Sequence, residues 1–371
     1  MKIPLVDLKA NYLSIKEEID SSIQRVIENS SFIMGKEVGE FDKNFARFIN
    51  SKYAIGVGNG TFALHLSLIA SDIKQNDEII TVPNTFIATT EAISYCGAKP
   101  VFVDIEEEGY NINSNLIEEK ITNKTKAIIA VHLYGNSCNL EEILKICDKN
   151  NLKLIEDCAQ AHGAEYNGLK LGNFGSLAAF SMFPAKVLGS FGDAGAVVTN
   201  NEDLAKKVNL LRNHGRMNKY EHIIEGYNYR IDALQAAILN VKLKYLDNWI
   251  EKRRDAASLY NKFFNENGLY EFIKTPKESK NSKHCYYMYV IRVKDRERLQ
   301  NYLNENEIET GVHYPLPLHL QQAYKNLNYK KGDFPVAEKH AEEILSIPLY
   351  PEISEEQIDY VVNKINKFYK N

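Results

Sequence analysis

Short apolar runs alternate with stretches of helical periodicity through the first half of the chain, and this alternation limits the fold more than any other feature. The helical stretches, such as 62–73 and 140–150, carry apolar residues three and four positions apart. Strand, helix, strand in this order is typical of a mostly parallel sheet with helices on both faces. The expected strands are 53–57, 78–82, 100–103, 127–133, 152–156, 177–182 and 195–199.

The end of this series and the second half of the chain follow different patterns. The last two apolar runs are joined by a glycine-rich turn with no helix between them, so one strand should be antiparallel. A chain of 371 residues is long for one core, and we expect a large α/β domain at 1–248 and a smaller α+β domain at 249–371. A strand is expected at 286–293. Before it, one long amphipathic helix is predicted by Ile231, Leu234, Ile238, Val241, Tyr245 and Trp249.

Composition excludes several classes of protein. The net charge is −4 and neither sign forms a long block, so no basic face for nucleic acid is expected, although a local pocket can still bind a small anion. The sequence has no apolar signal core and no stretch of about 18 apolar residues, which argues against a membrane protein. The five cysteines are scattered without a CxxC pattern, which argues against a disulfide framework, structural zinc or an iron–sulfur cluster. We expect a cytoplasmic protein.

Lys186 lies in the segment 183–189, directly after a strand that should be buried, and has apolar neighbours on both sides. An unpartnered buried ammonium is costly, and lysines in such settings act as neutral amines that form Schiff bases. Alternatively, the side chain extends past the turn and places its head group in solvent. The segment alone favours neither interpretation.

Asp157 follows the apolar run 152–156, and ligands of α/β sheets bind outside the carboxyl ends of strands. A buried carboxylate there suits the protonated ring nitrogen of a pyridine-type cofactor, because it keeps that nitrogen cationic. An N-cap for a following helix is the alternative, and it is the more common role of Asp at a strand end.

The segment 56–61 reads Gly-Val-Gly-Asn-Gly-Thr and lies between an expected strand and an expected helix. Its small residues leave backbone N–H groups free at the helix N-terminus, which is typical of a phosphate site. A dinucleotide site is the alternative, but it requires an acidic residue at the end of the next strand. That strand ends at Thr81-Val82-Pro83-Asn84, so a monophosphate fits better.

Phosphate turn, ring-nitrogen acid and Schiff-base lysine follow one another along the chain in an order that fits a single chemistry. With further motifs, they make the chain similar over nearly its whole length to the sugar aminotransferase family of fold-type I pyridoxal-phosphate enzymes. The resemblance implies a mixed, mostly parallel seven-stranded sheet between helices, and a small C-terminal domain. The matching segments are IPLVDL (3–8), GKEV (35–38), GTFALHL (60–66), NTFIAT (84–89), EDCAQAHGA (156–164), SMFPAK (181–186), GDAGA (192–196) and GYNYR (226–230).

The resemblance implies a role for each matched residue of the cofactor site. Lys186 would hold pyridoxal 5′-phosphate as a Schiff base and then act as general base and acid. Asp157 would pair with the pyridinium nitrogen, and a homodimer with shared active sites is implied because Asn228 would reach the phosphate of the neighbouring subunit. The other implied contacts are Phe86 against the ring, Gln160 at its phenolic oxygen, and Gly60, Thr61 and Ser181 at the phosphate.

The resemblance also implies a nucleotide-linked keto-sugar as amino acceptor and L-glutamate as donor. The segments 57–60, 84–89 and 313–317 resemble members that act at C3 of dTDP-3-keto-6-deoxyhexoses. Transamination at C4 stays an alternative, as do a dehydratase relative, which would lack the lysine, and a regulatory paralogue without turnover. Three residues depart from the common C3 pattern, namely Phe62, Met182 and Phe183. The residues expected near the substrate are Arg212, Arg216, Lys219, Tyr220, His313, Tyr314 and His319, although 212–220 could equally be a solvated loop.

Overall fold

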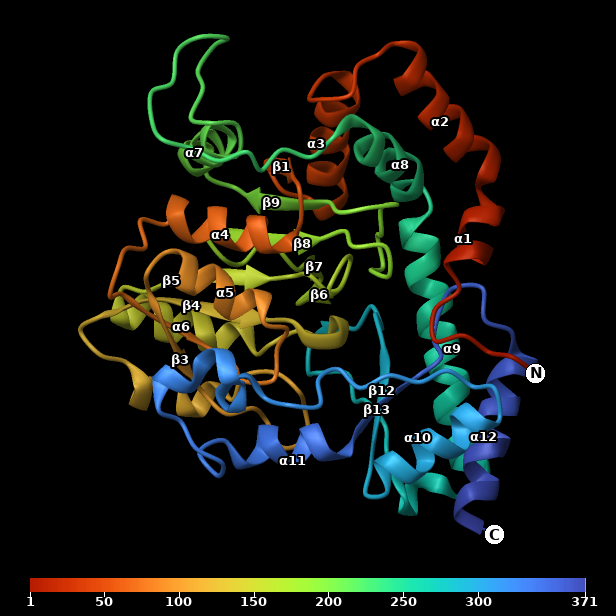
Figure 1. Ribbon diagram of the computed structural model, residues 1–371. Helices are drawn as coiled ribbons and strands as arrows, with labels where there is room; N and C mark the ends of the chain where they lie inside the picture. The colour runs from red at the N-terminus through yellow and green to blue at the C-terminus, as the bar shows by residue number, and fades with distance from the viewer. Residues whose placement is uncertain (371) are drawn as a thin grey trace.

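A seven-stranded sheet forms the centre of the larger part of the protein, as the computed structural model in Figure 1 shows; the structure describes residues 1–370. The strand order is β1-β9-β8-β5-β4-β2-β3, and β9 is antiparallel to both of its neighbours while the other pairs are parallel. The predicted mixed sheet with one antiparallel strand is therefore confirmed. The strands are β1 (Tyr53–Val57), β2 (Glu78–Thr81), β3 (Lys99–Phe102), β4 (Thr125–Val131), β5 (Lys153–Asp157), β8 (Leu177–Ser181) and β9 (Gly195–Thr199).

Helices cover both faces of this sheet. Neighbouring residues of β8 point to opposite faces: Phe180 packs edge to face on Phe45 of α3, with ring centroids 5.1 Å apart, whereas Ser181 lies against Gly60 at the start of α4. Burial on both sides explains why the strands are continuous apolar runs, and every residue of β9 is buried. The helices around the sheet are α3 (Lys36–Ile49), α4 (Gly60–Ala70), α5 (Ala88–Tyr95), α6 (Leu140–Asn150), α7 (Glu202–Arg212) and α8 (Ala233–Leu243).

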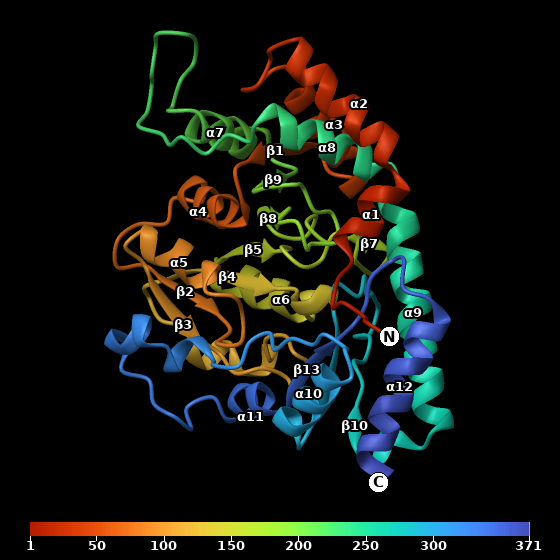
Figure 2. The same ribbon diagram turned by 45° about the vertical axis from the view of Figure 1, so that its right-hand side comes forward.

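The single long helix predicted after Arg230 is wrong. The structure has two helices, α8 and α9 (Leu246–Glu266), which run in different directions (Figures 1 and 2). At the junction the backbone hydrogen bonds shorten to three-residue spacing, from Lys244 N–H to Val241 O and from Tyr245 N–H to Lys242 O. Lys244 and Tyr245 both contact Glu18 of α2 (Lys16–Glu28), so a distant helix holds the turn.

The C-terminal part has its own sheet and its own apolar cluster. Strands β10 (Ile273–Lys274), β12 (Tyr289–Val293) and β13 (Ile344–Ile347) form an antiparallel sheet. Alternate residues of β12 serve two cores: Val290 packs in the cluster of the large sheet, whereas Tyr289 and Ile291 pack in the C-terminal cluster. Ile3 also packs in the C-terminal cluster, while the division at 248/249 stays a prediction.

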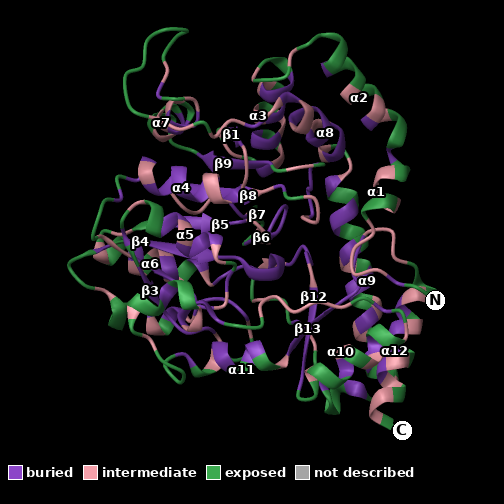
Figure 3. Ribbon diagram, in the orientation of Figure 1, coloured by how far each residue is buried: buried purple, intermediate pink, exposed green. Residues whose placement is uncertain are grey.

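The remaining elements include α10 and α12, whose buried residues pack in the C-terminal cluster, and Figure 3 shows how burial is distributed along the chain. No helix within residues 1–370 is long and apolar enough to cross a membrane. The remaining helices and strands are α1 (Leu8–Ser14), β6 (Glu165–Tyr166), β7 (Leu169–Lys170), β11 (Ser282–Lys283), α10 (Arg296–Glu305), α11 (Pro335–Glu343) and α12 (Glu355–Lys370), with 3-10 helices at Ser114–Leu116, Glu118–Lys120, Leu133–Gly135, Leu269–Glu271, Leu318–Leu320 and Gln322–Leu327.

Candidate active site

A cavity of about 510 Å³ opens at the carboxyl ends of β4 and β5, beside the N-terminus of α4. Its size is typical of small-ligand sites, and its position is the usual one in α/β sheets. The structure brings most of the predicted cofactor residues together here, with two of the residues predicted near the substrate. The predicted residues that line the cavity are Gly60, Thr61, Phe86, Asp157, Gln160, Ser181, Lys186, His313 and Tyr314.

Asp157 is the last residue of β5, and its carboxylate is buried on the cavity wall. Thr89 Oγ1 donates a hydrogen bond to Oδ2 (2.8 Å) and Ala159 N–H donates to Oδ1 (3.2 Å). Burial raises the pKa of Asp157, and these two hydrogen bonds and the charge of Lys186 oppose that shift. The helix-cap interpretation of Asp157 is wrong, because residues 158–164 of the described chain form turns rather than a helix.

A buried pair supports this wall from behind. His132, directly after β4, accepts the N–H of Cys138 at Nδ1 (3.2 Å), so its Nε2 carries the proton and donates to Glu156 Oε2 (3.1 Å). Glu156 Oε1 accepts the backbone N–H groups of Phe174 and Gly175, both at 2.8 Å. Burial alone would raise the pKa of Glu156, but the hydrogen bond from His132 and those from the backbone N–H groups bring the pKa below its usual value.

His132 and Glu156 also lie close to Cys158, and the potential metal-ligand atoms of the three residues are within 4.8 Å of one another. Such a group resembles a metal site. Each oxygen of Glu156 already accepts protein N–H groups, including that of Gly172 (2.9 Å). The group therefore acts as a hydrogen-bonded support for the sheet edge. Sequence reasoning missed His132 and Thr89; the position of His132 at the end of an apolar run was the available signal.

Lys186 lies in the turn after β8 and faces the cavity. Its Nζ is 4.5 Å from the centre of the Tyr287 ring, and the side chain is half-buried, so the head group does not extend past the turn. The turn is held at its end: Ser190 Oγ donates to Met182 O (2.7 Å), and buried Lys242 Nζ donates to Gly189 O (2.7 Å). Burial lowers the pKa of Lys242 to about 8.

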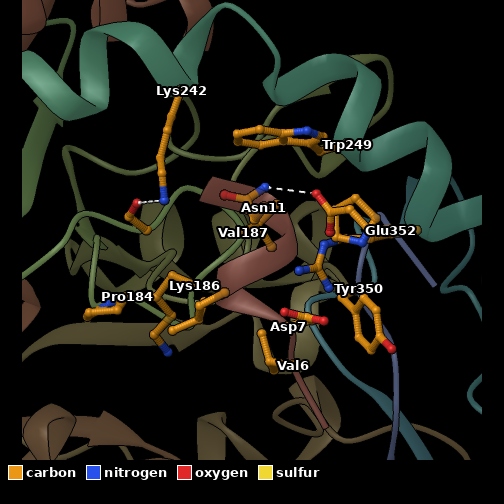
Figure 4. Close-up of a pocket in the computed structure, with 14 residues that line it drawn as sticks. Val6, Asp7, Asn11, Pro184, Lys186, Val187, Lys242, Trp249, Tyr350 and Glu352 are labelled. Carbon is orange, nitrogen blue, oxygen red and sulfur yellow. Dashed lines mark hydrogen bonds between the residues drawn. The ribbon is translucent and has the colours of Figure 1, made fainter. Parts of the chain in front are cut away.

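A second, much smaller cavity lies behind Lys186, between the turn and α9 (Figure 4). Lys242 and Trp249 border it on one side, and Glu352 borders it on another, where it accepts a hydrogen bond from Asn11 Nδ2 (3.1 Å). Its volume of about 20 Å³ has room for about one water molecule. Lys186 thus lines both cavities.

The predicted phosphate turn stands at the start of α4. Asn59 Oδ1 caps the helix by accepting Phe62 N–H (2.8 Å). A Cβ atom added at Gly60 would lie 2.6 Å from Ser181 Cβ, so glycine is required for the turn to approach β8 this closely. The hydroxyls of Thr61 and Ser181 and the free N–H groups of the first helical turn line the same end of the cavity, which fits an anionic group.

Aromatic and amide side chains form the opposite end. The Phe86 and Tyr314 rings lie 5.6 Å apart, and Gln160 Nε2 is 3.4 Å from the Tyr314 hydroxyl. Gln160 Oε1 accepts Tyr134 N–H (2.7 Å), which fixes the orientation of the amide. His313 Nδ1 lies 2.9 Å from Ser346 Oγ, and burial lowers the pKa of His313 to about 4, so its ring is neutral near pH 7.

The structure does not bring the other predicted residues to this cavity. His319 is buried and hydrogen-bonds Glu338 Oε1 (3.0 Å), and Arg212 is buried in an ion pair with Asp42 (3.2 Å). Asn228 is exposed at the end of α7, where it pairs with Asn213. Arg216, Lys219 and Tyr220 lie on an arm formed by 214–226, which projects away from the sheet (Figure 1).

Comparisons with known proteins identify the family to which this protein belongs. Residues 13–366 match the DegT/DnrJ/EryC1/StrS aminotransferase family, and the chain belongs to that family. It is 45% identical over 366 residues to the dTDP-3-amino-3,6-dideoxy-alpha-D-galactopyranose transaminase of Aneurinibacillus thermoaerophilus, covering 99% of each chain. It is also 45% identical, over 100% of each chain, to a Geobacillus stearothermophilus protein named pleiotropic regulatory protein.

The fold is confirmed by a solved structure. Streptomyces venezuelae DesV, in complex with a ketimine intermediate, superposes with a TM-score of 0.97 at 36% identity, covering 100% of this chain and 99% of that one. Members of this family depend on pyridoxal phosphate, so the predicted enzyme class and cofactor are confirmed for the family. In this chain the Asp157 carboxylate, the Lys186 amine and the glycine-lined turn at Gly60 fit that cofactor's ring nitrogen, aldehyde and phosphate.

Proposed function

We propose that this protein transfers an amino group from L-glutamate to C3 of a dTDP-linked 3-keto-6-deoxyhexose, giving a dTDP-3-amino-3,6-dideoxyhexose. The arrangement that carries the proposal is one cavity with a buried carboxylate, a lysine and a helix N-terminus on its walls. The name of the A. thermoaerophilus relative supports the sugar and the carbon.

Pyridoxal phosphate, when bound, supplies a ring that withdraws electrons from the substrate carbon. The Asp157 carboxylate would hold the ring nitrogen protonated, while the Thr89 hydrogen bond keeps the carboxylate oriented. The Lys186 amine would hold the cofactor and, as general base and acid, would take a proton from the substrate carbon and give one back. Phe86 would pack against the ring, and the turn at Gly60 and Thr61 would bind the phosphate.

We place the enzyme in the cytoplasm as a homodimer with shared active sites. Its five cysteines are free, and four of them are buried, which suits a reducing compartment. Asn228 is exposed and absent from the cavity of its own chain, which supports a contact with the phosphate in the partner's site. The arm at 214–226 would bring Arg216, Lys219 and Tyr220 to the nucleotide diphosphate, and the large and small domains would be 1–248 and 249–371.

Two alternatives involve the same cavity. Transamination at C4 would use the same residues. A regulatory role is suggested by the name of the G. stearothermophilus relative, although Lys186 and Asp157 are both present here. A dehydratase is disfavoured because dehydratase relatives lack the lysine.

Purified protein loaded with pyridoxal phosphate should be incubated with L-glutamate and either dTDP-3-keto- or dTDP-4-keto-6-deoxyhexose. Locating the new amine by NMR identifies the carbon, and we expect it at C3. An amine at C4 would establish the alternative carbon, and absence of 2-oxoglutarate with every sugar tested would favour the regulatory role.

A further inference from the structure

A stack of aromatic rings joins the phosphate turn to the segment that carries Asn228. Phe62 directly follows Thr61 in the first turn of α4, and its ring lies parallel to that of Tyr229, with centroids 3.7 Å apart and an interplanar angle of 2°. Tyr229 in turn stacks on Tyr227, with centroids 4.8 Å apart. The two tyrosines flank Asn228, so the stack sets the position of the residue between them.

Backbone contacts reinforce this connection. Gly58 N–H donates to Tyr229 O (2.9 Å), and Val57 forms an antiparallel bridge with Arg230. A Cβ atom at Gly58 would lie 3.3 Å from the Phe62 ring and 3.4 Å from Arg230 O, so the turn and the segment are in close contact. Residues 57–62 and 227–230 therefore form one unit, which we name the phosphate unit.

His65 extends the unit one turn further along α4. Its ring packs edge to face on Tyr227, with centroids 5.2 Å apart, and its Nδ1 lies 3.4 Å from the Tyr229 hydroxyl. Burial lowers the pKa of His65 to about 4, so the ring is neutral near pH 7 and packs as an aromatic group. One unit therefore carries two residues that face different ways. Thr61 faces the cavity of its own chain, and Asn228 faces outward.

We propose that Phe62 is a positioning residue that couples the two cofactor sites of the dimer. The inference rests on the proposed shared sites, in which each phosphate contacts Thr61 of one chain and Asn228 of the partner subunit. Each phosphate unit then contacts both cofactors, and each cofactor contacts both units. The first cofactor to bind orders both units, and the second binds to units that are already ordered, which makes binding cooperative.

The test is a titration of the apo-homodimer with pyridoxal 5′-phosphate, followed by the absorbance of the bound cofactor. The wild-type isotherm should have a Hill coefficient above one. In Phe62→Leu, which keeps an apolar side chain but removes the ring, affinity should fall by roughly three- to tenfold and the Hill coefficient should fall to one. Phe62→Tyr keeps the ring and should bind like the wild type.

The matched control is Phe272→Leu, which removes a comparable stack on Tyr369 (4.7 Å, 11°) in the C-terminal part of the chain. It should leave both affinity and Hill coefficient unchanged. Equal loss of affinity in Phe62→Leu and Phe272→Leu would show a general loss of stability and overturn the proposal.

Failure of the coupling can be told apart from failure of the shared site. Sedimentation and an Asn228→Ala titration test the shared site: a monomer, or unchanged affinity in Asn228→Ala, overturns both proposals. If the protein is a dimer and Asn228→Ala binds weakly, a non-cooperative wild-type isotherm overturns the coupling alone. That last result needs no Phe62 variant, so the inference stays testable even where Phe62→Leu fails to fold.

Discussion

The carboxyl edge of the central sheet is buried and hydrogen-bonded within the chain, whereas the arm at 214–226 is exposed along most of its length. Asp157 is 5% exposed and has two hydrogen-bond donors, while Tyr220 is 82% exposed and its ring lies near only the Nζ of its neighbour Lys219, 5.3 Å from the ring centre. The difference separates two tasks: the rigid edge holds reacting groups in place, and the arm offers groups for recognition. If the two regions divide the work in this way, changes at the edge should affect the reaction itself, and changes on the arm should affect binding of the sugar nucleotide.

The largest effect is expected at Lys186. Lys186→Ala removes the only amine placed on the cavity wall among the described residues, so transamination should fall below detection. Borohydride treatment of the loaded wild type should link the cofactor to Lys186, as peptide mass spectrometry can show, and the variant should give no such link. Lys280→Ala, at an exposed site, is the control. Cofactor reduced onto another lysine would contradict the assignment.

Asp157→Asn should slow the proton transfer while leaving the cofactor bound. Asn keeps an acceptor for Thr89 but leaves the ring nitrogen without a negative partner, so the rate should fall roughly 100- to 1,000-fold, as when one electrostatic contact at a reacting centre is lost. Single-turnover kinetics with L-glutamate measures this step directly. An unchanged rate would show that the carboxylate serves only to hold the turn at 158–164.

Glu156→Gln should affect stability rather than chemistry. The variant removes a buried charge that accepts three backbone N–H groups and His132, so the free energy of unfolding should fall by about 2–4 kcal/mol. Because folding lowers the pKa of Glu156, its contribution is complete above the usual pKa near 4.5 and is lost as the pH falls through the lower value in the folded protein.

Denaturant unfolding at several pH values measures both parts of this prediction. The difference between wild type and Glu156→Gln should be full at pH 7 and should shrink toward low pH. Glu141→Gln, which breaks only an exposed pair with Lys145, should unfold like the wild type. A difference that grows as the pH falls would reverse the assigned sign.

The residues of the rigid edge were largely predictable from the sequence, because burial of a strand determines the residue types within that strand. Strands buried on both faces must be apolar runs, so their ends, and with them Asp157 and Lys186, could be located from residue types alone. The break between α8 and α9 could not, since the apolar spacing continues through Tyr245 and the turn depends on Glu18 of a distant helix. Thr89 was missed for the same reason: its contact with Asp157 exists only after α5 packs on the sheet.

Motif similarity identified which segments lie near the site, but it did not show which way each side chain points. His313 and His319 both belong to the segment expected near the substrate, yet His313 lines the cavity while the His319 ring turns inward to Glu338. Arg212 likewise turns inward to Asp42. The direction of a side chain depends on packing between elements, which a single sequence does not show.

A smaller effect tests whether Asn228, just after the arm, belongs to the active site of the other subunit. When Lys186→Ala and Asn228→Asp proteins are mixed and exchange subunits, each heterodimer has one site with both defects and one with none. Half of the dimers are mixed after complete exchange, so roughly a quarter of wild-type activity should return. The Asn228→Asp homodimer should itself bind cofactor weakly, because a carboxylate would face the phosphate. Demonstrated exchange without recovered activity would place each site within one chain.

The smallest effect is expected on the arm. Tyr220→Ala removes an exposed ring with no buried contact, so the free energy of unfolding should change by less than about 0.5 kcal/mol. If the arm reaches the nucleotide of the partner's site, KM for the keto-sugar nucleotide should rise roughly threefold, the loss of about one modest aromatic contact. The half-reaction with L-glutamate should keep its rate, since that substrate has no nucleotide. Tyr270→Ala, 47% exposed in the C-terminal part, is the control for KM: it also removes the hydrogen bond from the Tyr270 hydroxyl to Asn261 O (3.0 Å) and should leave KM unchanged. A slower glutamate half-reaction in Tyr220→Ala would mean that the arm supports the reacting groups themselves, and the separation between rigid edge and recognising arm would have to be abandoned.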